Sequence, residues 1–176
     1  MKTLTLIRHA KSSWDDPFLD DFDRPLNPRG RHDLPLMCAR MLAHGPAPDQ
    51  LIHSTALRTH LTASALIDTF RLTDRAVCGT DRIYEADVSV LEALLRQQSN
   101  EHQHLMLVGH NPGLLLLAHW LCQQAPDRLP TAAIIQLELP LTYWRDLAPG
   151  CARTVWFDYP KLHRPLAPER DTLASS

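Results

Sequence analysis

Two arginines and two histidines come at or soon after the ends of apolar runs in this sequence: Arg8, His9, Arg58 and His110. A guanidinium group stays charged and presents planar donors that match the oxygens of a phosphate. A neutral imidazole is a nucleophile near neutral pH, so a histidine beside two arginines can attack phosphorus without a metal or a separate base. The positive charges nearby should also lower the proton occupancy of the ring. These residue types therefore predict phosphoryl transfer.

The four side chains can meet only if the apolar runs are neighbouring strands. Thr3–Ile7, Leu51–Ser54 and Leu105–Val108 read as strands, and helical periodicity fills the stretches between them. Such alternation is typical of an α/β domain, with a largely parallel sheet covered by helices. Ligands of these sheets bind just outside the carboxyl ends of the strands, and that is where the arginines and histidines stand.

The remaining elements follow from periodicity and turn residues. Five apolar residues recur at helical spacing and form a stripe along one side of a predicted helix: Leu34, Met37, Cys38, Met41 and Leu42. Pro35 is expected to begin this helix and Gly45 to end it. Further helices are expected over 57–70 and 88–95 and after Asn111-Pro112-Gly113, with strands at 133–139 and 155–157.

A chain of 176 residues suits one domain. We expect that domain to cover residues 1–160. Residues 161–176 are polar and interrupted by Pro165 and Pro168, so we expect a loosely ordered C-terminal tail. No internal repeat suggests a second domain.

The net charge, the apolar stretches and the cysteine spacing limit which partners and which cellular location are expected. The formal net charge is −2, which gives no reason to expect nucleic acid or an anionic membrane as a partner. No apolar stretch is long enough to span a bilayer, and Arg8 comes too early for a signal peptide. The four cysteines form no CxxC pair. These features favour a cytoplasmic protein, and they leave the oligomeric state open.

The segment Leu6-Ile7-Arg8-His9-Ala10-Lys11-Ser12 resembles the Arg-His-Ala-Lys-Ser opening of SixA-type phosphohistidine phosphatases, which belong to the histidine phosphatase (phosphoglycerate mutase-like) superfamily. The resemblance continues in chain order to about residue 160, through Asp23-Arg24-Pro25-Leu26, Arg29-Gly30, Ser54-Thr55-Ala56-Leu57-Arg58, Ile83-Tyr84-Glu85-Ala86 and Gly109-His110-Asn111-Pro112-Gly113. Several motifs in family order are far more specific than one Arg-His pair.

The resemblance implies a three-layer α/β/α sandwich around a mixed, mainly parallel sheet, and an enzyme that needs no cofactor and no metal. It implies that His9 is the phosphorylated nucleophile, while Arg8, Arg58 and His110 bind the phosphoryl group. Glu85 is the best positional match for a proton donor, and Asp87 is its rival. The choice between these two carboxylates stays open.

The predicted function is a phosphatase that removes phosphate from phosphohistidine in a protein. An imidazole leaving group has a pKa of about 6.5 and needs little acid catalysis, whereas an alkoxide needs a proton. A small-molecule phosphomonoesterase of the same superfamily is the first alternative, favoured if Glu85 is essential. A non-catalytic phosphoprotein-binding module is the alternative from another class, and the intact His9 and His110 argue against it.

Other polar residues have a plainer interpretation. Lys11 and Ser12 could line the phosphate site, but an exposed loop is the commoner outcome. His102 and His104 lack further ligands for a metal. Five aspartates suggest a magnesium cluster, although a solvated acidic loop that repels anions or contacts a basic partner is the better interpretation: Asp15, Asp16, Asp20, Asp21 and Asp23.

Overall fold

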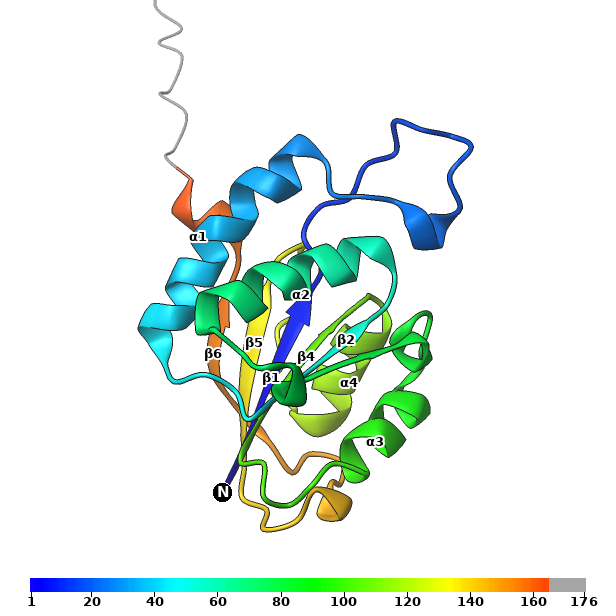
Figure 1. Cartoon of the computed structure of the whole chain (residues 1–176). Helices are drawn as coiled ribbons and strands as arrows, with labels where there is room; N and C mark the ends of the chain where they lie inside the picture. The colour runs from blue at the N-terminus through cyan, green and yellow to red at the C-terminus, as the bar shows by residue number, and fades with distance from the viewer. Residues whose placement is uncertain (165–176) are drawn as a thin grey trace, which may run out of the picture.

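The computed structural model describes residues 1–164 and contains one mixed sheet (Figure 1). Its strands are β1 (Lys2–Arg8), β2 (Gln50–Ser54), β3 (Val77–Thr80), β4 (His104–Gly109), β5 (Ile134–Leu139) and β6 (Arg153–Asp158). They lie in the order β3-β2-β4-β1-β5-β6. The pairings among β1 to β4 are parallel, while β5 pairs antiparallel with both β1 and β6. The mixed, mainly parallel sheet is confirmed.

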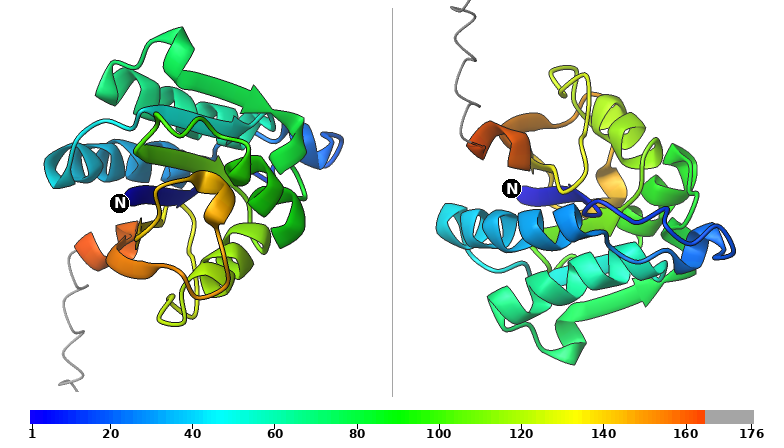
Figure 2. Two further views of the ribbon diagram at one scale, coloured as in Figure 1. Left: turned by 90° about the horizontal axis from the view of Figure 1, so that it is seen from below. Right: turned by 90° about the horizontal axis from the view of Figure 1, so that it is seen from above.

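Four α-helices cover the two faces of this sheet (Figure 2). They are α1 (Pro28–His44), α2 (Leu57–Phe70), α3 (Val88–Arg96) and α4 (Gly113–Leu121). The helices α1 and α2 bury their apolar sides against one face, where Leu34 and Leu66 join Met106 of β4. On the other face, Leu95 and Leu117 pack with Leu107. The predicted three-layer α/β/α sandwich is confirmed.

Short 3₁₀ turns connect these elements: η1 (Asp21–Asp23), η2 (Asp74–Ala76), η3 (Asp81–Ile83), η4 (Trp144–Asp146) and η5 (Pro160–His163). The segment between β1 and α1, which contains η1, stands out from the body of the domain at the upper right of Figure 1. An isolated bridge between Ser12 and Leu26 closes its base.

The strand register brings the predicted functional residues to one edge. Arg8 at the end of β1 pairs with Gly109 at the end of β4. On the other side of β4, His53 pairs with Val108, so Ser54 also ends at this edge. Because parallel strands present their carboxyl ends together, the residues that follow β1, β2 and β4 become neighbours.

The start of α1 differs from the prediction, because the helix begins at Pro28 rather than Pro35. The side-chain oxygen of Asn27 accepts a hydrogen bond from the backbone N–H of Gly30 at 2.8 Å and caps the helix. Pro28 takes the first helical position, where a missing N–H costs nothing. Pro35 lies inside the helix, and Leu42 is 54% exposed, outside the buried stripe.

Two other segments were predicted incompletely. The edge strand β3 was missed, since its four residues are short of apolar character and two of them are exposed. Within the predicted tail, residues 161–163 belong to η5, and Arg164 forms an ion pair with Asp33 of α1 at 2.8 Å. This contact joins Arg164 to the domain, while the loose order expected of the tail stays a prediction. The prediction for residues 165–176 falls outside the described part of the chain.

Candidate active site

A cavity of about 650 Å³ opens at the carboxyl edge of β1, β2 and β4. All five predicted site residues line it: Arg8, His9, Arg58, Glu85 and His110. The structure thus brings together side chains from the ends of β1 and β4, from the first turn of α2 and from the segment before α3. Lys11 and Ser12, which the sequence left outside the site, also line the cavity.

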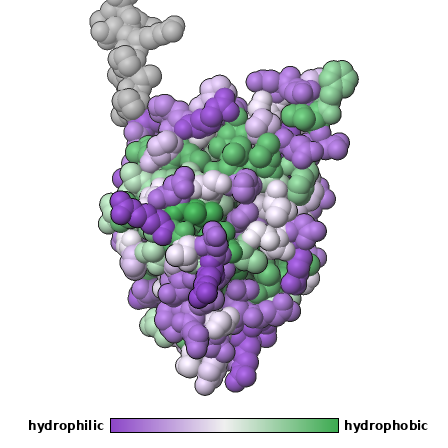
Figure 3. All heavy atoms as spheres, viewed as in Figure 1, coloured by the Kyte–Doolittle hydropathy of each residue, from purple (hydrophilic) through white to green (hydrophobic). Residues whose placement is uncertain are grey.

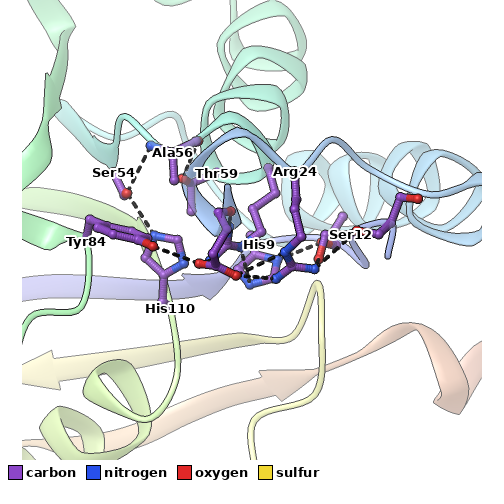
Figure 4. A network of polar contacts seen from close by, with 12 residues as sticks. His9, Ser12, Arg24, Ser54, Ala56, Thr59, Tyr84 and His110 are labelled. Carbon is purple, nitrogen blue, oxygen red and sulfur yellow. Dashed lines mark hydrogen bonds and ion pairs between the residues drawn. The ribbon is translucent and has the colours of Figure 1, made fainter. Parts of the chain in front are cut away.

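His9 is buried at the centre of the site, with 6% of its surface exposed (Figure 4). Its Nδ1 lies 2.7 Å from the backbone oxygen of Ala10. A carbonyl oxygen only accepts, so Nδ1 carries the ring proton in the neutral tautomer. The unprotonated Nε2 lies 3.4 Å from Nε of Arg58, which donates to it. The lone pair that a nucleophile needs is therefore on Nε2.

The pKa of His9 is lowered to about 3. Burial is the main cause, and the charges of His110, Arg58 and Arg8 add to it in that order, while the bond to Ala10 opposes them. The sequence pointed to the arginines alone, so it identified a secondary cause. His9 is neutral across the physiological range, which is the nucleophilic form of imidazole.

The two arginines occupy different environments. Arg58 stands in the first turn of α2 and is buried, with its Nη2 2.9 Å from Oδ2 of Asp21. Arg8 donates from Nη1 to the backbone oxygen of Leu129 at 3.1 Å. Among residues 1–164, Nε of Arg8 has no hydrogen-bond partner although it is buried. Unpaired buried donors are costly and are typical of functional sites.

His110 completes the group of rings. Its centroid lies 5.3 Å from that of His9, and its Nε2 is 2.8 Å from the hydroxyl of Ser54 (Figure 4). Burial, followed by the charge of Arg58, lowers the pKa of His110 to about 4. The edge of Tyr84 packs on this ring at 5.5 Å between centroids. Two neutral imidazoles therefore face two guanidinium groups.

Asp21, Arg24 and Tyr84 also line the cavity, although the sequence assigned none of them to the site. Oδ2 of Asp21 accepts from the hydroxyl of Tyr84 at 2.8 Å, and Oδ1 accepts from Nε of Arg24 at 3.0 Å. Burial alone would raise the pKa of Asp21, but hydrogen bonds from Tyr84, Arg24 and Arg58 lower it to about 2. Arg24 and Tyr84 stand in motifs that resemble the family, whereas Asp21 was interpreted as part of a solvated acidic loop.

The two candidate proton donors differ in their surroundings. Asp87 caps α3, because its Oδ1 accepts from the backbone N–H of Val90 at 3.0 Å and from the hydroxyl of Ser89 at 2.7 Å. These bonds, the one from Ser89 first, lower the pKa of Asp87. Glu85 is exposed, and its backbone is in the left-handed region with φ 53°. A non-glycine residue held there is a reason to look for function.

The part of the chain that the structure describes contains no preformed metal site. No three or more His, Cys, Asp or Glu side chains are grouped there to hold an ion. Asp21 is paired with arginines, and Nε2 of His104 lies 2.9 Å from the hydroxyl of Thr5. Nor does any helix of residues 1–164 combine the length and apolar character needed to cross a membrane.

The model of the histidine phosphatase superfamily (branch 1) matches residues 4–112. The chain belongs to this superfamily. It is therefore a phosphatase of the class that uses a histidine nucleophile. A Mycobacterium tuberculosis protein of uncharacterised function is 30% identical over 165 residues, which cover 88% of this chain and 100% of the relative.

Solved structures of this superfamily share the fold. A candidate phosphohistidine phosphatase SixA from Agrobacterium tumefaciens is 28% identical with a TM-score of 0.72, over 90% of this chain and 98% of that one. A candidate SixA from Nakamurella multipartitia is 25% identical with a TM-score of 0.77, over 90% and 96% of the two chains. The histidine phosphatase described here is thus of the SixA type in sequence and fold.

Proposed function

We propose that this histidine phosphatase removes the phosphoryl group from phosphohistidine in proteins, through a covalent intermediate on His9. The observation that carries the proposal is the orientation of His9. Its Nδ1 is occupied by the oxygen of Ala10, and its Nε2 is directed into the cavity beside Arg58. The ring is thus held in the tautomer that has its lone pair on Nε2, and the bond from Arg58 has to break when Nε2 attacks phosphorus.

The reaction divides into two displacements at phosphorus. In the first, Nε2 of His9 forms a bond to phosphorus while the bond from phosphorus to the leaving group breaks. In the second, water attacks phosphorus, inorganic phosphate leaves, and neutral His9 is restored. Arg8, Arg58 and His110 bind the oxygens of the group in transfer, whose negative charge the guanidinium groups stabilise. No step of this scheme uses a metal or a cofactor.

Phosphohistidine is favoured over an ester by leaving-group chemistry. Transfer from one imidazole to another exchanges similar nitrogens, with pKa values near 6.5 in both cases. Such a transfer needs no strong general acid, and Asp87 is committed to capping α3. The SixA-type structures that share 28% and 25% of residues with this chain support the same substrate class.

A small-molecule phosphomonoesterase is the second candidate. It is favoured by Glu85, which lines the cavity from a strained backbone conformation and has the position of a proton donor. An ester needs that donor, because general acid catalysis of alkoxide departure typically contributes about 10²–10⁴-fold. Two expectations stay predictions, namely that residues 1–160 form the catalytic domain and that the protein is cytoplasmic.

Turnover of a phosphohistidine-bearing protein beside a panel of phosphate esters tests this proposal. Wild type and Glu85→Gln are compared with a metal chelator present. We expect cleavage of phosphohistidine that Glu85→Gln leaves nearly unchanged, and poor turnover of esters. Efficient ester turnover that Glu85→Gln abolishes would instead establish the phosphomonoesterase. Loss of all activity on adding the chelator would refute the metal-free mechanism.

A further inference from the structure

The loop between β1 and α1 presents two aromatic side chains to solvent beside the active site. Trp14 is 76% exposed and Phe18 is 95% exposed. Figure 3 shows apolar atoms at the outer corner of this loop, among hydrophilic ones. Large exposed aromatic groups are unfavourable in water and are enriched at the centres of protein interfaces. Their position needs an explanation that the catalytic chemistry does not supply.

The loop is ordered by its own contacts. The guanidinium carbon of Arg24 lies 3.5 Å from the centroid of the Trp14 ring, and Nη1 of Arg24 donates to the hydroxyl of Ser12 at 2.7 Å. The backbone N–H of Phe18 donates to Oδ1 of Asp16 at 2.9 Å. A preorganised loop loses little conformational entropy when a partner binds.

The two rings define the size of the partner. Trp14 lines the active-site cavity, whereas Phe18 is not among the residues that line it. A ligand that touches both must therefore extend out of the cavity along the loop to Phe18. A phosphorylated metabolite ends inside the cavity, while a protein that carries the phosphoryl group on a side chain continues across this surface.

The charge of the loop defines the chemistry of the partner. Residues 13–23 contain five aspartates and no lysine or arginine. Asp21 is paired with Arg24 and Arg58, but Asp15, Asp16 and Asp20 are exposed. Negative charge at the rim repels a free anion and attracts a cationic surface. The rim thus has the opposite sign to the arginines deeper in the cavity.

We propose that Trp14 and Phe18, with the exposed aspartates beside them, form a docking surface for a phosphohistidine protein that has basic and apolar residues next to its phosphorylated histidine. This inference rests on the proposed function and adds the recognition of the protein around the phosphoryl group. The rings would pack on the apolar residues, and Asp15 and Asp20 would pair with the basic ones.

Two synthetic phosphohistidine peptides of equal length test the surface. One has lysines and leucines beside the phosphohistidine, and the other has glutamates in place of the lysines. For wild type we expect kcat/KM to be about tenfold higher on the lysine peptide, since a few exposed charge pairs contribute that much. Asp15→Asn combined with Asp20→Asn should reduce this preference to about twofold.

Phe18→Ser tests the aromatic part. It should lower kcat/KM on both peptides about fivefold and leave hydrolysis of free phosphohistidine unchanged. Matched controls are Leu42→Ser, which removes an exposed apolar group on α1, and the pair Asp68→Asn with Asp74→Asn. The controls should behave as wild type on all three substrates.

The three substrates separate the two proposals. If free phosphohistidine and both peptides resist wild type while esters are hydrolysed, the proposed function is wrong, and the docking surface with it. If free phosphohistidine is hydrolysed but the peptides show no charge preference, the docking surface alone is refuted. An equal loss on free phosphohistidine and peptides in Phe18→Ser would also refute docking, because the loop would then act through the shape of the cavity.

Discussion

Nε of Arg58 lies 3.4 Å from Nε2 of His9 and donates a hydrogen bond to it. The two residues come from α2 and from the end of β1, 49 positions apart in the sequence. This contact places a permanent positive charge beside the nitrogen that would attack phosphorus. An incoming phosphoryl group would therefore meet its nucleophile and one of its cationic partners at a single point.

His9→Ala should lower kcat by roughly three orders of magnitude or more, because no other group replaces the nucleophile. Wild type that has been mixed rapidly with a labelled phosphohistidine substrate should retain label on the protein, and His9→Ala should retain none. Inorganic phosphate should still bind His9→Ala in calorimetry, since Arg8, Arg58 and His110 remain. Label on the variant would show that another residue is phosphorylated.

Asp21→Asn should make inorganic phosphate a better inhibitor, with Ki lowered about fivefold. The carboxylate of Asp21 occupies Nη2 of Arg58 at 2.9 Å, so it competes with phosphate for that donor, and a charge pair whose carboxylate is solvent-exposed is worth about 1 kcal/mol. Asp23→Asn is the control, because Asp23 is an exposed neighbour in η1. A higher Ki in Asp21→Asn would mean that the carboxylate positions Arg58 rather than competing with phosphate.

The stability of the protein should fall as the pH drops below about 6.5. Burial lowers the pKa of His9 to about 3 and that of His110 to about 4. The unfolded chain binds protons on these rings from about pH 6.5 downward, while the folded protein does not, so protons favour unfolding. This contribution is complete above pH 6.5 and is lost as the pH falls toward the folded values.

Urea unfolding between pH 5 and pH 8 measures this dependence. His9→Gln removes one of the rings whose pKa the fold lowers, so its free energy of unfolding should change less with pH than that of wild type. Parallel profiles for the two proteins would show that His9 is not held neutral by the fold.

Gly113→Ala should destabilise the protein by about 1–3 kcal/mol, the usual range for overpacking. A Cβ at this position would lie 2.4 Å from the backbone oxygen of Ala86. Removing this steric overlap requires movement of the segment that carries Glu85, so ester turnover should fall as well. Gly45→Ala is the control, because no heavy atom lies within 4 Å of its added Cβ, and its free energy of unfolding should stay within about 0.5 kcal/mol of wild type. Equal unfolding midpoints for the two variants would contradict the close packing.

The sequence predicted the residues at the strand ends well, for a physical reason. Arg8, His9 and His110 directly follow apolar strands, and parallel strands end at a common edge. Recognising the strands in the sequence was therefore enough to predict that these residues lie close together. The sequence also predicted a helix layer on the sheet, because Leu34, Met37 and Met41 recur with the period of a helix that is buried on one side.

Local pattern was less informative at the ends of elements. Two prolines compete as the start of α1, and only the hydrogen bond from Gly30 to Asn27 selects Pro28. The edge strand β3 has little apolar character, because its position leaves part of it exposed. Arg164 contacts Asp33, which is 131 positions away, so composition alone could not predict this contact.

What the sequence indicated by itself is a set of groups suited to phosphate transfer, namely two arginines and two histidines at or soon after the ends of apolar runs, while Glu85 was added only by the family resemblance. Only the tertiary structure decided the protonation of His9, through its contact with Ala10 and its burial. It also decided that Asp21 reaches Arg58, 37 positions away, and Tyr84, 63 positions away. Periodicity reports which side of an element is buried, whereas contacts of this kind depend on how a loop folds back across the finished sheet.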